Sequence, residues 1–211
     1  MKQLQVALDV ESTEKALEVL EKVADYVDII ELGTPLMIHE GKKVISAIKE
    51  KYPDKIIFSD IKIMDGGSIM ADIVFEAGAD MVSVLAAAND QTIIDVIDTA
   101  KKYRRKVLVD MVAIEDLKER ASKVNEWKPD YISVHIGTDV QDGGADPVEE
   151  VKRMGNLGDT LIAAAGGISL DNFEEACKSN INDIIVGGSI YNAKSPEKIA
   201  KEMFNIINKY R

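Results

Sequence analysis

Residues 55–65 read Lys-Ile-Ile-Phe-Ser-Asp-Ile-Lys-Ile-Met-Asp, an apolar run that ends in charged side chains. The part Lys55–Asp60 predicts a β-strand, and because strand side chains alternate between two faces, Asp60 and Lys62 should share one face. Opposed charges at the end of an apolar strand are costly to bury and hard to explain by packing. We interpret the stretch as a strand that carries a lysine, held charged between carboxylates, to a site for an anionic group. A surface Asp–Lys pair is the alternative.

Short apolar runs of the same kind recur along the whole chain. Between them lie segments whose apolar residues repeat at helical spacing, among them Thr13–Ala24, Gly41–Lys51, Gln91–Lys102 and Pro196–Tyr210. The predicted strands are Gln3–Asp9, Val27–Glu31, Lys55–Asp60, Met81–Leu85, Lys106–Met111, Tyr131–His135, Leu161–Ala165 and Asp183–Val186.

Eight strands that alternate with eight helices, at a repeat of about 25 residues, predict parallel βαβ units. The strands are apolar nearly throughout, as expected when both faces of a sheet are covered. A closed (β/α)₈ TIM barrel and an open doubly wound sheet are the two solutions. Polar residues end many strands, whereas an open sheet would concentrate its site at one switch point. We therefore expect a barrel formed by residues 1–211 as a single domain, since no linker or composition break divides the chain.

The composition limits the function classes. The chain of 211 residues carries a formal net charge of −11, which argues against a nucleic-acid partner because phosphate-backbone binding needs a basic patch. Cys177 is the only cysteine, so an intrachain disulfide is excluded and a reducing compartment is favoured. No apolar run reaches the ~20 residues that a bilayer requires, and no signal-peptide pattern precedes the first strand. We expect a cytoplasmic protein without a membrane partner.

Acidic residues end three of the early strands, at Asp9, Glu31 and Asp60. In a barrel these side chains meet at one rim, where carboxylates repel each other unless a cation intervenes. A hard divalent ion with oxygen ligands, such as Mg²⁺, would satisfy Glu31 and Asp60. The alternative is that each acid caps the following helix, which applies above all to Asp9.

His135 ends another predicted strand. At the same rim as Lys62 and Asp65 it is placed to take or give a proton near neutral pH. A structural histidine on a strand is the alternative. The second histidine, His39, lies in a loop-to-helix region and receives no role.

Glycine pairs follow the last two predicted strands, at Gly166-Gly167 and Gly187-Gly188. Paired glycines let backbone N–H groups approach an anion, and in (β/α)₈ barrels the loops after strands seven and eight often bind phosphate. These pairs predict a substrate that carries a phosphate monoester. The alternative is that the glycines merely permit tight turns.

Six segments follow one another at compatible spacing: Ala7-Leu-Asp9, Asp28-Ile-Ile-Glu31-Leu-Gly-Thr-Pro35, Asp60-Ile-Lys62-Ile-Met-Asp65, Val134-His135, Gly166-Gly167 and Val186-Gly187-Gly188. Together they resemble the orotidine monophosphate decarboxylase superfamily. Within it the chain is most similar to the 3-hexulose-6-phosphate synthases, and the 3-keto-L-gulonate-6-phosphate decarboxylases are near relatives.

The resemblance implies Mg²⁺-dependent aldol addition of formaldehyde to D-ribulose 5-phosphate through a metal-stabilised enediolate. The implied metal ligands are Glu31 and Asp60. His135 would carry the proton, and Lys62 would stabilise developing negative charge while Asp9 and Asp65 hold it charged. In the family the second aspartate of the Asp60–Asp65 motif reaches the neighbouring subunit's site, so a homodimer with Asp65 across the interface is expected.

The resemblance also implies the substrate contacts. Asp110 would contact substrate hydroxyls. The phosphate would be bound through backbone N–H groups of Gly167, Gly187, Gly188 and Ser189.

The two kinds of relative differ at a few rim positions. The decarboxylases have Glu in place of Asp110, Arg in place of Thr138, Thr in place of Ala165 and Arg in place of Gly188, so all four positions favour the synthases. Decarboxylation stays open because the enediolate is shared, and a non-catalytic phosphosugar-binding barrel is the other alternative. Gly66-Gly67 departs from the Ala that many relatives have and should loosen the start of the next helix.

Overall fold

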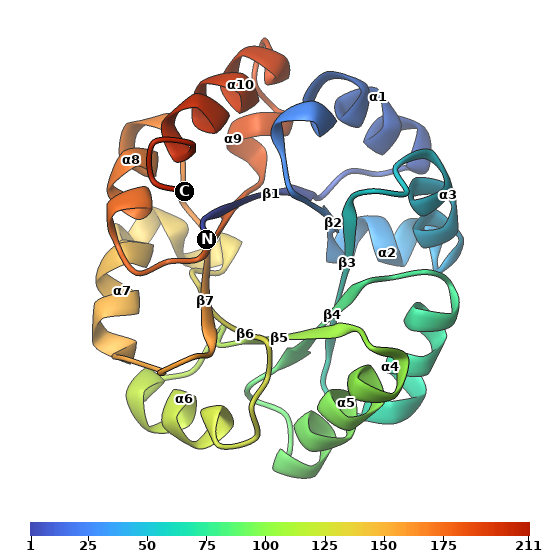
Figure 1. The fold of residues 1–211 in the computed structure, drawn as a ribbon, viewed down its shortest axis with the longest axis vertical. Helices are drawn as coiled ribbons and strands as arrows, with labels where there is room; N and C mark the ends of the chain where they lie inside the picture. The colour runs from blue at the N-terminus through green and yellow to red at the C-terminus, as the bar shows by residue number, and fades with distance from the viewer.

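Eight parallel strands close into a barrel and follow one another around it in the order of the sequence (Figure 1). The structure is a computed structural model that describes residues 1–211, apart from the side chain of Asp142. Strand β1 pairs with β8, so the sheet has no free edge. The strands are β1 (Gln3–Leu8), β2 (Ile29–Leu32), β3 (Ile56–Ile63), β4 (Met81–Leu85), β5 (Lys106–Asp110), β6 (Tyr131–His135), β7 (Leu161–Ala165) and β8 (Asp183–Val186).

The predicted (β/α)₈ barrel is confirmed, and the open doubly wound sheet is excluded. The bounds of β4, β6, β7 and β8 are those expected from the sequence. Strand β3 is longer than predicted and continues past Asp60 to Ile63. It does so because Ile61 and Ile63 still pack against the main apolar core while Asp60 and Lys62 line the cavity at the barrel mouth.

Helices surround the barrel (Figure 1). The described residues form ten α-helices where eight were expected, because the short helices α2 and α9 begin directly after β2 and β8. With seven and four residues, these two are too short for apolar periodicity to reveal them. The helices are α1 (Thr13–Val23), α2 (Thr34–Glu40), α3 (Lys43–Lys51), α4 (Gly67–Glu76), α5 (Asp90–Tyr103), α6 (Leu117–Asn125), α7 (Pro147–Met154), α8 (Leu170–Lys178), α9 (Gly188–Tyr191) and α10 (Pro196–Ile207), with 3₁₀ turns η1 (Ala24–Tyr26) and η2 (Thr138–Gly143).

Two apolar clusters explain why the strands are apolar throughout. The larger one joins the outward faces of the strands to the helices. The smaller one lies inside the barrel and takes one residue from each strand: Ala7, Ile29, Phe58, Met81, Leu108, Tyr131, Ala163 and Ile185. Filling of the interior by side chains is typical of this fold, and the inner cluster forms the floor below the polar strand ends.

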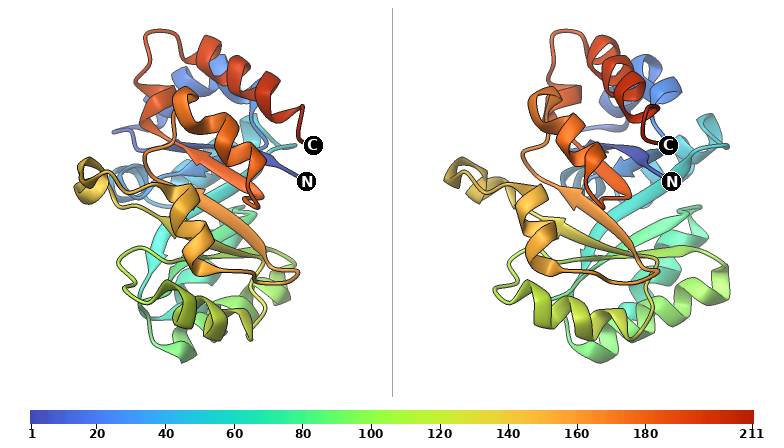
Figure 2. Two further views of the ribbon diagram at one scale, coloured as in Figure 1. Left: turned by 90° about the vertical axis from the view of Figure 1, so that its left-hand side faces the viewer. Right: turned by 60° about the vertical axis from the view of Figure 1, so that its left-hand side comes forward.

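The two ends of the barrel differ (Figure 2). Both termini lie at the end where the strands begin, and the guanidinium of Arg211 donates to the backbone oxygen of Lys2 there. The segment that contains η2, gold in Figure 2, projects from the other end. In the described part of the chain, no helix combines the length and the apolar character that a membrane span requires.

Helix α4 begins in close contact with α5. A Cβ on the buried Gly67 would lie 2.5 Å from the backbone oxygen of Thr92 and 3.2 Å from Cγ2 of Val96. This glycine therefore lets the two helices approach each other, and the expectation that Gly66-Gly67 loosens the start of α4 stays a prediction.

Replacement of Gly67 by alanine should lower the free energy of unfolding by about 1–3 kcal/mol, because an added Cβ in a packed contact forces the backbone to shift. Urea unfolding followed by circular dichroism measures the change. Gly143→Ala is the matched control, since a Cβ there meets no atom within 4 Å. Equal stability of the two variants would contradict the packing argument.

Candidate active site

A cavity of about 560 Å³ opens at the ends of the strands. All predicted site residues except Asp65 line it: Asp9, Glu31, Asp60, Lys62, Asp110, His135, Gly167, Gly187, Gly188 and Ser189. Asp65 lies between β3 and α4 and is exposed. His39 is exposed on α2 and lies outside the cavity lining.

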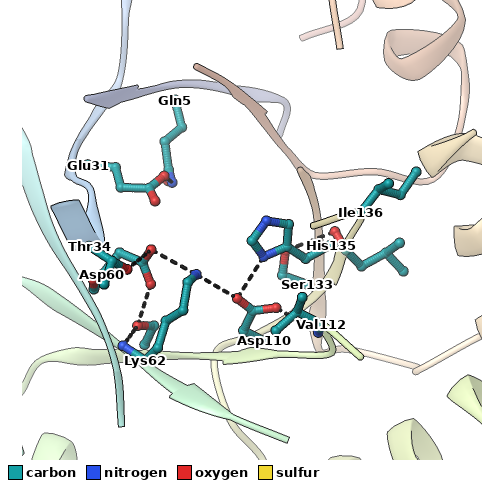
Figure 3. A network of polar contacts seen from close by, with 12 residues as sticks. Gln5, Glu31, Thr34, Asp60, Lys62, Asp110, Val112, Ser133, His135 and Ile136 are labelled. Atoms are coloured by element: carbon teal, nitrogen blue, oxygen red, sulfur yellow. Dashed lines mark hydrogen bonds and ion pairs between the residues drawn. The ribbon is translucent and has the colours of Figure 1, made fainter. Parts of the chain in front are cut away.

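Lys62 is the centre of a polar network (Figure 3). Its Nζ lies 2.9 Å from Oδ2 of Asp60 and 3.1 Å from Oδ2 of Asp110. The same Asp110 oxygen lies 2.8 Å from Nδ1 of His135. Asp110 therefore joins the lysine to the histidine, and the other ring nitrogen of His135 faces the open centre of the site (Figure 3).

The charges in this network reinforce each other. Burial alone would raise the pKa of Asp110, but His135, Lys62 and the N–H of Val112 outweigh burial and lower the pKa below its ordinary value. Burial would likewise lower the pKa of Lys62, but the negative charges of Asp60 and Asp110 raise it instead. The lysine and Asp110 are therefore ionised at neutral pH.

The ion pairs of Lys62 differ from those predicted. Among the described residues, Asp60 and Asp110 are the acids that form ion pairs with Lys62 within 4 Å, and Asp9 and Asp65 are not. The charge of Lys62 still acts to lower the pKa of Asp9, and the role of Asp65, expected from a neighbouring subunit, stays a prediction. Lys62 and Asp110 are 48 residues apart in the sequence, but the ends of β3 and β5 face the same barrel mouth. The sequence separation alone therefore gives no sign of this contact.

Two hydroxyl groups fix the carboxylate of Asp60, which is 6% exposed. The hydroxyl of Ser83 donates to Oδ1 at 2.7 Å. The hydroxyl of Thr34, at the start of α2, lies 3.0 Å from Oδ2 and 2.8 Å from the backbone oxygen of Asp60. These contacts leave Oδ2 pointing at the ammonium of Lys62 (Figure 3).

Glu31 is a buried carboxylate with a neutral partner. Its Oε2 accepts a hydrogen bond of 2.6 Å from Nε2 of Gln5, and both side chains point into the site (Figure 3). Burial first, and then the charges of Asp60 and Asp9, raise the pKa of Glu31 well above its ordinary value. An ionised Glu31 therefore costs free energy unless a cation approaches it.

Asp9 lies exposed at the rim of the cavity, where Gly33 makes room for it. A Cβ on Gly33 would collide with Oδ1 of Asp9. Desolvation at the rim and the charge of Asp60 raise the pKa of Asp9. Ser12 caps α1 by accepting from the N–H of Lys15, so the alternative role of Asp9 as a helix cap is excluded.

The loops after β7 and β8 form one wall of the cavity, and this wall carries no charged side chain among the described residues that line it. The hydroxyl of Ser189 donates to the backbone oxygen of Ile168 at 2.8 Å, which ties the two loops together. Gly188 begins α9, a helix of four residues in which the N–H groups of Ile190 and Tyr191 donate to the backbone oxygen of Gly187. Tyr191 and Asn192, at the end of α9, also line the cavity.

The chain matches the orotidine 5'-phosphate decarboxylase / HUMPS family over residues 2–203. It belongs to this family. The resemblance inferred from the six segments is therefore confirmed, and the fold is the one that the family resemblance implies.

Several members of the family are similar to this chain over nearly its full length. The 3-hexulose-6-phosphate synthase of Mycobacterium gastri is 42% identical over 200 residues, which cover 95% of this chain and 97% of that protein. The structure of the 3-hexulose-6-phosphate synthase from Salmonella typhimurium is 38% identical, with a TM-score of 0.96 over 99% of this chain and 100% of that chain. A 3-keto-L-gulonate-6-phosphate decarboxylase from Vibrio cholerae is 26% identical, with a TM-score of 0.87 over 100% of this chain and 99% of that chain.

The neutral residues that orient the carboxylates of Glu31 and Asp60 were not predicted from the sequence. Gln5 and Ser83 are polar residues inside otherwise apolar strands, and both are fully buried. A polar residue within an apolar strand indicates a buried hydrogen-bond partner, because a buried polar side chain needs one. Gln5 and Ser83 could therefore have been recognised from the sequence. Thr34, Tyr191 and Asn192 carried no such signal.

Glu31→Gln should raise the free energy of unfolding of the metal-free protein at pH 7 by about 1–2 kcal/mol. The raised pKa means that the folded chain binds the Glu31 proton more tightly than the unfolded chain, so stability falls as pH rises and Glu31 ionises. The gain should vanish near pH 4, where Glu31 is protonated in the folded wild type and largely protonated in the unfolded chain.

Urea unfolding with a chelator at both pH values measures this difference. Glu18→Gln is the control, since Glu18 is exposed on α1 and pairs only with Lys15. A Glu31→Gln variant that is less stable than wild type at pH 7 would contradict the electrostatic argument.

Proposed function

We propose that the protein is a 3-hexulose-6-phosphate synthase, an aldehyde-lyase located in the cytoplasm. It adds formaldehyde to D-ribulose 5-phosphate to give D-arabino-hex-3-ulose 6-phosphate and catalyses the reverse reaction. The observation that carries this proposal is the linked network of Lys62, Asp110 and His135, which shares one cavity with Glu31 and Asp60. Relatives of that activity align over nearly the full chain and support it.

Glu31 and Asp60 would hold the proposed Mg²⁺. The described residues contain no group of three or more His, Cys, Asp or Glu side chains arranged to bind a metal, so the chain offers two carboxylates rather than a closed cage. Mg²⁺ is commonly held by one or two carboxylates together with water and substrate oxygens. The buried charge of Glu31 also favours a cation. When bound, the ion polarises substrate oxygens and acidifies the neighbouring C–H.

His135 would move the proton at C1 of the sugar. Because Asp110 is ionised, it accepts Nδ1–H of His135 and leaves Nε2 free to act as the base. Removal of the C1 proton gives the enediolate, and C1 then forms a bond to the formaldehyde carbon. The former carbonyl oxygen of formaldehyde takes up a proton, which His135 can return, so no other proton donor is needed.

Lys62 would stabilise negative charge as it develops on the sugar oxygens. Asp60 and Asp110 fix the ammonium on two sides, and their charges raise the pKa of Lys62, so it stays protonated throughout turnover. Charge that is already oriented before the reaction needs no reorganisation in the transition state.

The phosphate would bind at the uncharged wall. Backbone N–H groups of Gly167, Gly187, Gly188 and Ser189 would hold it there, as suits an anion at the start of a helix. Contact of Asp110 with substrate hydroxyls is part of the same proposal.

The lining of the cavity favours the synthase over the decarboxylase. Among the described residues that line it, Lys62 is the only lysine or arginine. Thr138 and Gly188, where the decarboxylases have arginine, both line the cavity and leave it without the charge that would hold a sugar acid. Formaldehyde is neutral and needs no such partner. Phosphosugar binding alone would not require a lysine, an acid and a histidine in one network.

Purified protein should consume formaldehyde in the presence of ribulose 5-phosphate and Mg²⁺. A chelator should abolish turnover, and added Mg²⁺ should restore it. Lys62→Ala should lower kcat by about 10²–10³, as when an oriented donor is removed from an active site. Circular dichroism checks that the variant is folded.

Parallel assays separate the alternatives. Faster carbon dioxide release from 3-keto-L-gulonate 6-phosphate than formaldehyde consumption would favour the decarboxylase. Tight phosphosugar binding in calorimetry without either reaction would favour a binding protein. Full activity in the chelator would remove the metal role of Glu31 and Asp60.

We propose further that the protein is a homodimer in which Asp65 enters the partner's site. Exposed apolar side chains lie close to Asp65 in the sequence, on the loop and on α4: Met64, Ile69, Met70 and Ile73 are 52%, 66%, 38% and 38% exposed. Exposed apolar residues that gather in one region favour a protein interface. Asp65 carries a charge at the edge of this region, close in sequence to Lys62.

Mixing of inactive Lys62→Ala and Asp65→Ala variants tests the shared site. In a mixed dimer one of the two sites carries neither substitution, so random exchange should restore about a quarter of the wild-type sites. Activity is measured after partial denaturation and joint refolding, with each variant refolded alone as the control. Absence of any recovery, with mixed dimers shown by mass spectrometry, would place Asp65 outside the partner's site.

A further inference from the structure

Strands β3 and β4 lose their regular pairing at the active site. Ser59 is paired with Val82, and the next pair is Ile63 with Val84. Strand β3 therefore uses three residues, from Asp60 to Lys62, where β4 uses only Ser83. Irregular pairing of this kind re-aims side chains and is frequent next to active sites.

Lys62 has a backbone conformation that few side chains adopt. Its φ is 46°, in the left-handed region, inside a β-strand. A residue other than glycine is disfavoured there and persists only where its surroundings hold it. The N–H of Lys62 donates to the side-chain oxygen of Ser83 on the neighbouring strand β4, at 2.9 Å.

The same hydroxyl also holds the acid that pairs with Lys62. Ser83 Oγ donates its proton to Oδ1 of Asp60 at 2.7 Å while it accepts from the Lys62 N–H. A serine hydroxyl has one donor and two acceptor positions, so both contacts form together. Ser83 is fully buried and faces no solvent that could replace either contact.

We propose that Ser83 is a positioning residue for the active site. Its single hydroxyl locks the left-handed backbone of Lys62 and the carboxylate of Asp60 in the arrangement that brings Nζ to Oδ2. Without it, the Lys62 N–H loses this acceptor in a disfavoured conformation, and Oδ1 of Asp60 loses its hydrogen bond, so that the carboxylate is held only through Oδ2 by Thr34 and Lys62. The expected effect of Ser83 on catalysis rests on the proposed synthase function, whereas its effect on the positions of Lys62 and Asp60 does not.

Ser83→Ala should reduce kcat of the synthase reaction by about 10- to 100-fold, because displacement of a catalytic group by about an ångström has effects of this size. The KM for ribulose 5-phosphate should change little, since the phosphate is bound by the loops after β7 and β8. Ser83→Thr retains the hydroxyl and should restore most of kcat.

Ser59→Ala is the matched control. Ser59 is a fully buried serine in the same strand pair, but its hydroxyl donates to Sδ of Met37, and neither residue is among the described residues that line the cavity. Ser59→Ala should keep wild-type kcat. If both alanine variants lose similar stability in urea, a difference in kcat between them reports positioning rather than folding.

Crystal structures of wild type and Ser83→Ala provide the test that is independent of activity. In the variant Lys62 should leave the left-handed region, or its Nζ should move away from Asp60. Unchanged positions of Lys62 and Asp60, or a kcat within about threefold of wild type, would overturn the proposal. Absence of synthase activity in the wild type would reject the proposed function, and the structures would still decide the role of Ser83.

Discussion

The balance of charge around Lys62 is the constraint on which the site depends. Among the described residues that line the cavity it is the only lysine or arginine, and it is surrounded by carboxylates from β1, β2, β3 and β5 or their ends. Asp60 and Asp110 contact it directly and keep it protonated. Glu31 is buried near the negative charges of Asp60 and Asp9 and, among the described residues, has no ion pair with Lys62, which explains why the pKa of Glu31 is raised. A second positive charge, such as a bound cation, would therefore be stabilised in this cavity.

The rest of the pocket maintains this balance. The apolar cluster inside the barrel forms a dry floor, which strengthens every charge interaction above it. Neutral donors then orient the acids one by one: Gln5 holds Glu31, while Ser83 and Thr34 hold Asp60. Like charges gathered in one cavity cost free energy of folding, as expected of a site selected for reactivity rather than for stability. The loops after β7 and β8, where the phosphate is proposed to bind, contribute no charged side chain to the cavity lining that the structure describes.

Much of this arrangement was predictable from residue order. The alternation of apolar runs with helical periods indicated the barrel, and the parallel strands placed Asp9, Glu31, Asp60 and His135 at one mouth because all strands of such a barrel point the same way. The contacts of Lys62 were predicted less well. Asp110 was assigned to the substrate, since nothing local in the sequence reveals that it faces Lys62 across the barrel.

The sequence by itself therefore determined the fold class and the charged side chains that line the cavity, because these follow from periodicity and from which residues end strands. It also determined the family, through the resemblance of six segments. Only the tertiary structure decided the pairing of Lys62 with Asp110, the left-handed backbone of Lys62 and the double contact of Ser83. Alternation along a strand predicts that two side chains share a face, but it assumes regular pairing. The irregular register of β3 and β4 arises from packing between strands, which a single segment does not encode.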